Sequence, residues 1–325
     1  MKLRKLFRKQ GVTTVWAQEH DLSGKHIIVT GCAANSLGYA TVKTLASWGA
    51  LVVVTTRSNT HAALKQLKGE LLKANKPANI DGHNLDLSDW ASVNQFTDWY
   101  REHYGSRLDV LVNNAGIHLD LMSKWKEPTL TADGHEIHWR TNYLGTVQLT
   151  HNLLPLLQKT GTEQGDARVV NVVSQLHNRG SNDALFDENT AYNSWKFYGL
   201  SKLAMIHHSF EINRRFSGSH ELKGYSLHPG GRSGVHTNVA AKGLETGPKI
   251  ISALQRISAP VGKLFMASPE EGAQTQIHCA TAPSAEGGRY YQECAEFEAS
   301  ADCTDQGASI RLWDETLEWI SGQPK

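Results

Sequence analysis

Short apolar runs alternate with helical patterns along the first half of this chain, and this alternation constrains the fold more than any other feature. The runs are rich in β-branched residues and nearly all apolar, which is typical of strands buried on both faces. Strands that alternate with helices predict a parallel sheet covered by helices on both sides. The predicted strands are 26–30, 51–55, 108–112 and 168–173, and the predicted helices are 38–48, 60–74, 88–104 and 132–158.

A length of 325 residues alone suggests two domains, but no Pro/Gly/Ser-rich linker interrupts the series of strands and helices. We therefore expect a single α/β domain over residues 21–325, after a basic arm over residues 1–20. The expected architecture is a Rossmann-type, doubly wound parallel sheet of about seven strands with helices on both faces.

The first ten residues carry five positive charges and no negative charge. Leu3, Leu6 and Phe7 fall at helical spacing, so residues 1–10 could form a basic amphipathic helix on an anionic membrane surface. A frayed terminus is the alternative, and both stay open. No signal peptide or spanning helix is expected, because no apolar stretch of the required length follows. We expect a cytoplasmic protein and leave peripheral membrane contact open.

The charge and the cysteines exclude several other classes of function. A net charge of +1 gives no indication of nucleic-acid binding. The four cysteines form no Cys-x-x-Cys pair, which fits a reducing compartment. The histidines of His135-Glu136-Ile137-His138 lack the i, i+4 spacing of a zinc-protease helix, so no metal site is expected.

The first strand leads directly into a glycine turn and a helix. Gly31 follows the strand, and a helix begins near Gly38. Free backbone N–H groups and the helix dipole at such a helix N-terminus form an anion site, here for dinucleotide phosphates. The middle glycine of the usual dinucleotide fingerprint is replaced by Ser36, whose hydroxyl could donate to the pyrophosphate.

The end of the second strand indicates which dinucleotide binds. An NAD site usually has a carboxylate there, whereas an Arg accommodates the 2′-phosphate of NADP. Residues 55–58 contain no acid but include Arg57 and Ser58. We expect NADP(H) to be preferred over NAD(H), with Arg57 over the phosphate and Ser58 assisting.

Tyr198 and Lys202 lie four residues apart in a predicted amphipathic helix and therefore face the same side. An ammonium beside a phenol favours the phenolate, so we expect a lowered Tyr198 pKa and proton exchange with a substrate oxygen. Tyr192 and Lys196 have the same spacing, but they lie nearer a polar stretch, at or before the expected helix start.

Seven motifs in this order resemble the short-chain dehydrogenase/reductase family, and the resemblance covers about residues 21–319. The matching segments are Leu22-Ser23-Gly24-Lys25 leading into Thr30-Gly31; Asp86-Leu87; Asn113-Asn114-Ala115-Gly116; Asn142 in Thr141-Asn142-Tyr143-Leu144-Gly145; Ser174; Tyr198 with Lys202; and His228-Pro229-Gly230.

The resemblance implies a role for each matching residue. Ser174 would bind the substrate carbonyl, Tyr198 would exchange the proton, Lys202 would hold the nicotinamide ribose, and Asn142 would anchor a water that links Lys202 to solvent. Asp86 would contact adenine. The implied cofactor-binding residues are Gly31, Ser36, Leu37, Gly38, Arg57, Ser58, Asp86, Leu87, Asn113, Ala115, Gly116, Tyr198, Lys202, Pro229, Gly230 and Thr237.

Finer features are similar to the retinol-dehydrogenase-like and WW-domain-oxidoreductase-like branch of that family. They are the 24-residue gap between Ser174 and Tyr198 and the tail segments 288–291 and 311–314. The implied reaction is hydride transfer between NADP(H) and a carbonyl or alcohol substrate. Residues 239–266 mix apolar residues with glycines, so they are expected to form a substrate lid for a lipophilic substrate or, alternatively, plain core.

Two other functions remain open from the sequence. The fold could bind a dinucleotide as a redox sensor without turnover, or it could reduce a tetrapyrrole double bond in a light-dependent reaction. A homodimer is also open. The glycine loop and an insertion at 231–234, after Pro229-Gly230, depart from the family pattern, and Thr237, which the resemblance assigns to the nicotinamide side, follows this insertion.

Overall fold

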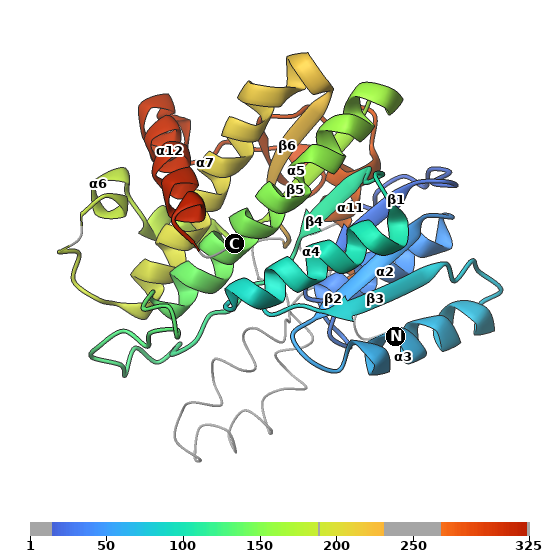
Figure 1. Ribbon diagram of the computed structural model, residues 1–325, viewed down its shortest axis with the longest axis horizontal. Helices are drawn as coiled ribbons and strands as arrows, with labels where there is room; N and C mark the ends of the chain where they lie inside the picture. Colours follow the sequence, from blue (N-terminus) through green and yellow to red (C-terminus); the bar gives the residue numbers. More distant parts are fainter. Residues whose placement is uncertain (1–14, 188, 231–267, 324–325) are drawn as a thin grey trace, which may run out of the picture.

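A parallel sheet forms the centre of the molecule (Figure 1). The computed structural model describes residues 15–187, 189–230 and 268–323. Seven strands run parallel, and a short eighth strand pairs antiparallel at one edge. This confirms the predicted Rossmann-type fold of about seven strands. In spatial order the strands are β3 (Ile80–Asn84), β2 (Leu51–Thr56), β1 (His26–Val29), β4 (Val110–Asn113), β5 (Ala167–Val172), β6 (Leu222–His228), β7 (Arg289–Gln292) and β8 (Ala295–Glu296).

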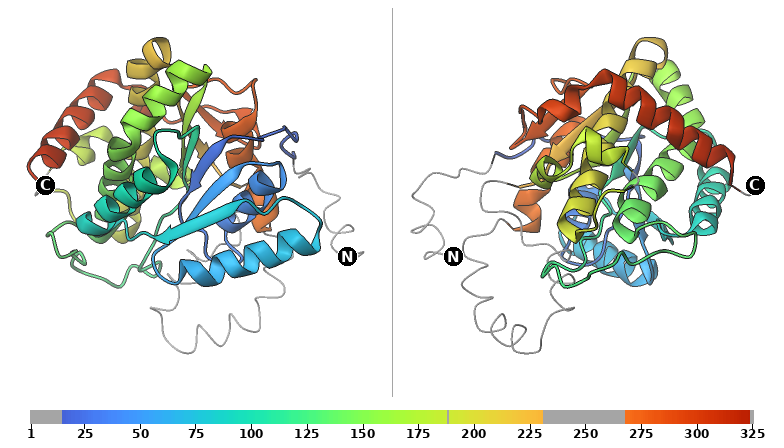
Figure 2. Two further views of the ribbon diagram at one scale, coloured as in Figure 1. Left: turned by 45° about the vertical axis from the view of Figure 1, so that its right-hand side comes forward. Right: turned by 90° about the vertical axis from the view of Figure 1, so that its left-hand side faces the viewer.

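Helices cover both faces of this sheet (Figure 2). One face carries α2 (Leu37–Ser47), α3 (Thr60–Lys73) and α11 (Gln274–Thr281), and the other carries α4 (Trp90–Tyr104), α5 (Gly145–Gln164) and α7 (Ser194–His220). The remaining described helices are η1 (Trp139–Leu144), η2 (Gln175–Arg179), α6 (Asn182–Leu185), α10 (Pro269–Gly272), η3 (Ala301–Thr304) and α12 (Gln306–Ser321).

The central strands are mainly apolar because each face packs against its own helices. In β1, Ile27 and Val29 belong to the core under α2, whereas Ile28 belongs to the core under α4 and α5. Val53 in β2 and Leu111 in β4 likewise face α4 and α5. Successive side chains of a strand point to opposite faces, so a strand between two helical layers needs apolar residues at every position.

The order of the strands reverses beside β1. The chain moves outward through β1, β2 and β3, then crosses back to β4 and continues through β5, β6 and β7. In open parallel sheets, ligands bind outside the carboxyl ends of the strands at such a switch point. The fold therefore places the candidate site above the ends of β1 and β4.

The helix predicted over residues 132–158 differs from the one observed. Residues Trp139–Leu144 form a π-helical turn, and the α-helix begins only at Gly145 and continues to Gln164. Leu130 forms an isolated antiparallel bridge with Glu136 before the turn. Short π-helical turns are rare and frequently occur at functional sites. Here the turn contains Asn142, whose side chain bonds the backbone of Ile117.

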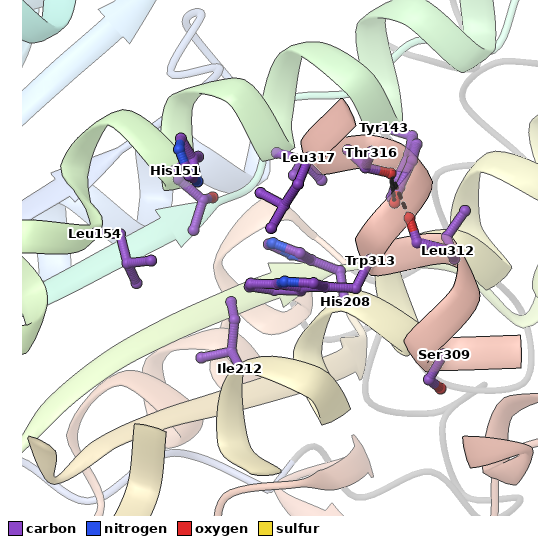
Figure 3. A pocket seen from close by; sticks show the side chains of 12 residues that line it. Tyr143, His151, Leu154, His208, Ile212, Ser309, Leu312, Trp313, Thr316 and Leu317 are labelled. Carbon is purple, nitrogen blue, oxygen red and sulfur yellow. Dashed lines mark hydrogen bonds between the residues drawn. The ribbon is translucent and has the colours of Figure 1, made fainter. Parts of the chain in front are cut away.

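The C-terminal helix α12 packs against α5 and α7 (Figure 3). Trp313 stacks on His208 of α7, with ring centroids 5.6 Å apart, and the Tyr143 hydroxyl pairs with Thr316 Oγ1 at 2.7 Å. A cavity of about 10 Å³ remains between the three helices. It is too small to hold a substrate, because even one water needs a volume of about this size.

Candidate active site

The loop after β1 has the geometry of a phosphate-binding turn. Gly31 has a φ of +73°, and a Cβ there would lie 2.8 Å from Ala115 Cα. A Cβ at Gly38 would lie 2.6 Å from Asn114 Nδ2, so this glycine lets α2 approach the end of β4. Both positions therefore require glycine, one for its backbone conformation and both for close approach.

Ser36 has a structural role in this loop. Its Oγ accepts a hydrogen bond from Tyr39 N at 3.1 Å, which caps the N-terminus of α2, and donates to the Gly31 carbonyl at 3.2 Å. The sequence expectation was a hydroxyl that donates to the pyrophosphate. In the structure the Ser36 hydroxyl donates to the Gly31 carbonyl, so this serine links the start of the glycine loop to the N-terminus of α2.

A cavity of about 300 Å³ opens above the ends of β1, β2 and β4. Eight of the residues expected to bind cofactor line it: Gly31, Ser36, Leu37, Arg57, Asp86, Leu87, Ala115 and Gly116. The sequence interpretation did not single out several other lining residues, among them Thr55, Thr56, His118 and Leu119, and it quoted Asn114 and Thr141 within motifs without assigning them a role. Most of these neighbour a recognised motif along the chain, and that proximity is the one signal the sequence offered.

One end of the cavity is lined by an arginine side chain and by a carboxylate that hydrogen bonds hold in place. Arg57 is exposed at the end of β2, and no carboxylate of the described residues forms an ion pair with it. Asp86 accepts hydrogen bonds from Ser88 N at 2.9 Å and Ser88 Oγ at 2.6 Å. Ser58 is exposed but is not among the lining residues, and its carbonyl accepts a hydrogen bond from Thr56 Oγ1 at 2.7 Å.

The two asparagines after β4 differ in their surroundings. Asn114 lines the cavity, and its Nδ2 donates to Thr30 O at 2.7 Å. Asn113 is buried, and its Nδ2 donates to Asn171 Oδ1 at 2.8 Å and Thr150 Oγ1 at 3.1 Å, tying β4 to β5 and α5. The amide nitrogen of Asn113 thus has a packing role in this structure, and its contact with the cofactor stays a prediction.

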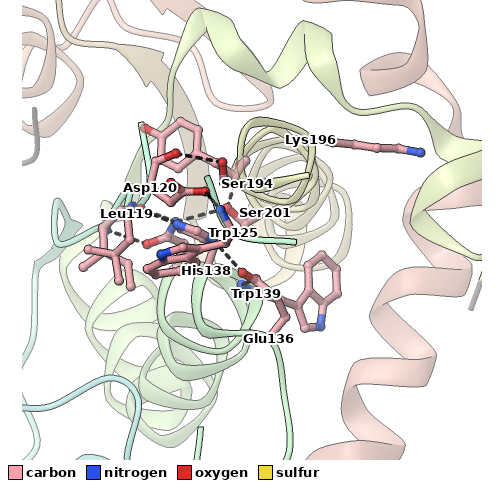
Figure 4. A network of polar contacts seen from close by, with 12 residues as sticks. Leu119, Asp120, Trp125, Glu136, His138, Trp139, Ser194, Lys196 and Ser201 are labelled. Atoms are coloured by element: carbon pink, nitrogen blue, oxygen red, sulfur yellow. Dashed lines mark hydrogen bonds and ion pairs between the residues drawn. The ribbon is translucent and has the colours of Figure 1, made fainter. Parts of the chain in front are cut away.

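Tyr198 and Lys202 lie in α7, whereas Tyr192 precedes it. Asn193 caps the helix, and its Oδ1 accepts hydrogen bonds from Trp195 N and Lys196 N. Tyr198 is 9% exposed and Lys202 is 4% exposed, with the ammonium 5.7 Å from the Tyr198 ring centroid. Lys196 points away from the neighbouring polar network (Figure 4). Of the two equally spaced pairs, only the one at 198 and 202 is buried.

Ser174, Asn142 and Gly116 surround this pair. Ser174 follows β5, and its side chain is close enough to that of Tyr198 to lower the Tyr198 pKa. Lys202 Nζ donates to Val172 O at 3.2 Å. A Cβ at Gly116 would lie 3.1 Å from Lys202 Nζ and 3.4 Å from Asn142 Oδ1. The four expected catalytic residues are not among the residues that line the cavity. Lys202 and Asn142 lie behind Gly116, and Tyr198 lies behind His118, and both Gly116 and His118 line it.

Burial determines the protonation of the pair. It raises the pKa of Tyr198 to about 12, and the neighbouring Ser174 side chain lowers this pKa only in part. Burial lowers the pKa of Lys202 to about 8. The expectation that Lys202 lowers the Tyr198 pKa is therefore not met here, because desolvation of the phenolate outweighs an ammonium 5.7 Å from the ring. At neutral pH, Tyr198 is a phenol that can donate a proton.

A polar network holds the segment after Gly116 against α7 (Figure 4). The carboxylate of Asp120 accepts hydrogen bonds from Lys124 N and Trp125 N, and its carbonyl accepts one from Ser194 Oγ. His138 bonds Glu136 Oε1 at 2.6 Å through Nδ1 and Leu119 N at 2.9 Å through Nε2. His138, which the sequence suggested only as a candidate metal ligand, is thus part of this support.

Several expectations concern residues at the limits of the structure. Pro229 and Gly230 follow β6 in the described chain. Thr237, the insertion at 231–234, the expected lid over 239–266 and the basic residues 1–10 lie outside the described residues. Within residues 15–187, 189–230 and 268–323, no group of three His, Cys, Asp or Glu side chains could hold a metal ion. No helix in this same part of the chain has the length and hydropathy needed to span a bilayer.

Comparison with known proteins identifies the family to which this chain belongs. The family model described as short chain dehydrogenase matches residues 25–233. Retinol dehydrogenase 11 from Homo sapiens is 32% identical over 322 residues, covering 98% of this chain and 92% of its own. The WW domain-containing oxidoreductase from Gallus gallus is 32% identical over 312 residues, covering 91% of this chain and 68% of its own.

The likeness extends to a solved structure. An uncharacterised protein from Mycobacterium paratuberculosis superposes with a TM-score of 0.68 at 26% identity, covering 95% of this chain and 98% of that one. The comparisons confirm both the expected family and its retinol-dehydrogenase-like branch.

Proposed function

This chain belongs to the short-chain dehydrogenase/reductase family, whose members use NAD(P) to oxidise alcohols or reduce carbonyls, and we propose that it does so as an NADP(H)-dependent enzyme with Tyr198 as general acid and base. The observation that carries the proposal is a buried phenol that lies near Ser174 and packs beside a buried ammonium. The proposed substrate is a lipophilic carbonyl compound or alcohol.

The lining of the cavity supports dinucleotide binding. Gly31 and Gly116 line it without side chains, and an added Cβ would crowd Ala115 at the first position and Lys202 at the second. The N-terminus of α2 opens toward the cavity, with Leu37 among the lining residues. Bound in this cavity, the nicotinamide supplies or accepts a hydride.

The end of β2 supports a preference for NADP(H). Arg57 lines the cavity without a carboxylate partner among the described residues, so its guanidinium is available for a 2′-phosphate. Thr55 and Thr56 end the strand where an NAD site usually carries an acid, and their hydroxyls bear no charge that would repel a phosphate.

The proton would move through Tyr198. With its pKa raised to about 12, the phenol holds its proton at neutral pH and can hydrogen-bond a substrate carbonyl together with Ser174. After donating that proton, Tyr198 would be a buried phenolate, which the Lys202 ammonium stabilises. The Asn142 side chain accepts a hydrogen bond from Ile117 N at 2.8 Å and donates one to Ile117 O at 2.9 Å. These two bonds fix the backbone next to Gly116.

A lipophilic substrate is supported by the residues beside the reacting groups. Ile117, Leu119 and Ile137 line the same cavity as His118, which contacts the Tyr198 ring. Apolar walls around a few polar groups are typical of sites for small hydrophobic ligands. The curated relative named as a retinol dehydrogenase supports the same substrate class.

Replacing Tyr198 tests the function directly. Tyr198→Phe keeps the ring but removes the transferable proton, so kcat with NADPH and a hydrophobic aldehyde should fall by about 10²- to 10⁴-fold. NADPH binding, measured by fluorescence titration, should persist. Tyr192→Phe is the matched control and should retain activity, because Tyr192 precedes the helix. Loss of activity in Tyr192→Phe instead would mean that the other pair carries the chemistry.

A further inference from the structure

His118 forms the closest ring contact of Tyr198. Their centroids lie 4.1 Å apart, and the two planes are nearly parallel at 11°. His118 is 4% exposed and lines the cofactor cavity two residues after Gly116. The imidazole therefore contacts the proposed acid and also forms part of the cavity wall.

Neighbouring rings fix the orientation of this imidazole. Trp195 meets it edge-on, with centroids 4.7 Å apart at 83°, and His138 does the same at 5.8 Å and 79°. His138 is itself held by Glu136 and by Leu119 N, as described above. Edge-to-face and stacked contacts of this kind restrict a ring to one plane. His118 thus presents its nitrogens in a fixed direction.

One of these nitrogens has no partner. His118 Nε2 is buried, and no group in the described part of the chain bonds it. Burial lowers the pKa of His118 to about 3, so the ring is neutral at physiological pH and offers one donor and one acceptor. A phenyl ring would make the same stacking contact without an unpaired buried nitrogen. The nitrogen is accounted for if a bound molecule pairs with it.

We propose that His118 is a specificity-determining residue whose Nε2 pairs with a second polar group of the substrate, adjacent to the reacting carbonyl. This inference rests on the proposed carbonyl reduction at Tyr198. Because His118 contacts the Tyr198 ring and lines the cavity, a substrate carbonyl bonded to the Tyr198 hydroxyl would bring its neighbouring atoms toward the imidazole. The favoured substrates are then lipophilic α-hydroxy ketones or diketones rather than simple ketones.

The test compares two matched substrates. Reduction of 1-hydroxy-2-octanone and of 2-octanone by NADPH is measured for the wild type and for His118→Phe. The ratio of kcat/KM values, hydroxyketone over ketone, should fall about five- to tenfold in His118→Phe, the scale of one hydrogen bond. His118→Gln, which keeps a hydrogen-bonding side chain, should restore part of the ratio.

Two further variants complete the design. His118→Leu removes the nitrogens without a ring, so the test stands even if the phenyl variant folds poorly, and its ratio should also fall. His26→Phe is the matched control, because His26 also has an unpartnered buried nitrogen but lies at the opposite end of β1. The ratio should be unchanged in His26→Phe.

The outcomes separate this inference from the proposed function. An unchanged ratio in His118→Phe and His118→Leu would overturn the role of His118 while leaving carbonyl reduction intact. A comparable loss of NADPH affinity in both variants would place the partner of Nε2 on the cofactor and also overturn it. A wild type that binds NADPH but reduces neither ketone would refute the proposed function, and the role of His118 with it.

Discussion

At the scale of single residues, burial has a larger effect than pairing on the charges of the active site. Lys202 and Tyr198 both lose hydration in the folded chain, which favours the neutral form of each side chain. The pKa of Tyr198 is therefore raised and the pKa of Lys202 is lowered. The phenol is thereby kept protonated and the ammonium is kept close to its titration point. A site with these two properties can give up a proton and regain it near neutral pH.

The lowered pKa of Lys202 predicts how stability depends on pH. Lysine titrates near 10.5 in the unfolded chain and near 8 in the folded protein. Between these values the unfolded state binds more protons, so this residue makes the free energy of unfolding rise with pH. Relative to Lys202→Met, the wild type should gain up to about 3 kcal/mol between pH 7.5 and 10.5. Urea unfolding of both proteins at several pH values measures this, and a constant difference would contradict it.

Arg57 predicts cofactor choice. Arg57→Ala removes a charge-assisted hydrogen bond to the 2′-phosphate, so NADPH affinity should fall by about 2 kcal/mol, while NADH affinity should change little. Titration of the intrinsic fluorescence with each dinucleotide gives both Kd values. Arg311→Ala is a suitable control, because Arg311 is an exposed arginine paired with Glu315 on α12. Equal losses for both dinucleotides would show that Arg57 does not face the phosphate.

At the scale of elements, the junction of η1 and α5 packs closely against the loop after β3. Gly145 packs against the carbonyl of Leu87, which also accepts a hydrogen bond from Arg140 at 2.8 Å. The loop after β3 and the start of α5 therefore touch through backbone alone. This contact places Leu87 and Asp86 at the cavity.

Two glycine substitutions distinguish packing from helix propensity. A Cβ at Gly145 would overlap the Leu87 carbonyl, so Gly145→Ala should destabilise the protein by about 1–3 kcal/mol or more. Gly69 in α3 has no atom within 4 Å of its would-be Cβ, so Gly69→Ala should stabilise by about 0.5–1 kcal/mol. Thermal unfolding of the two variants should therefore shift in opposite directions. Similar shifts for both would argue against the close contact.

The sequence allowed the four central strands β1, β2, β4 and β5 to be predicted closely because they are mainly apolar, whereas the ranges of β3, β6, β7 and β8 were not predicted. It was less informative where structure depends on distant partners. The π-helical turn at Asn142 depends on bonds to Ile117, 25 residues away. The stacking of His118 on Tyr198 joins residues 80 positions apart, and no local pattern indicates it. The expected pKa of Tyr198 was wrong because spacing indicates a neighbouring charge but not the extent of burial.

At the scale of the whole molecule, α12 joins parts of the chain that are far apart in sequence. Trp313 contacts His208 and lies under the Arg215 guanidinium at 5.0 Å. Trp319 donates to His135 Nε2 at 3.1 Å, and Arg140, which is fully buried, lies over its ring at 5.3 Å. The last helix therefore completes the burial of the segments that carry Asn142 and Tyr198.

A tryptophan on this helix tests its contribution. Trp313 is 9% exposed, and Trp313→Ala should destabilise the protein by about 3–5 kcal/mol through loss of packing. Trp16 is 60% exposed, so Trp16→Ala should change the free energy of unfolding by less than about 0.5 kcal/mol. Urea unfolding curves for the two variants provide the comparison. A small effect of Trp313→Ala would mean that α12 contributes little to global stability.

The position of α12 also bears on the order in which the protein is made. A ribosome releases the strands from β1 to β6 and the catalytic helix before it releases residues 306–321. Until then, the outer side of α7 and the guanidinium of Arg140 lack their final cover. Nascent chains expose apolar surface in this interval, and chaperones bind such surface. Premature termination just before α12 would yield a chain with every proposed catalytic residue but with this surface permanently uncovered, a substrate for quality control rather than an enzyme.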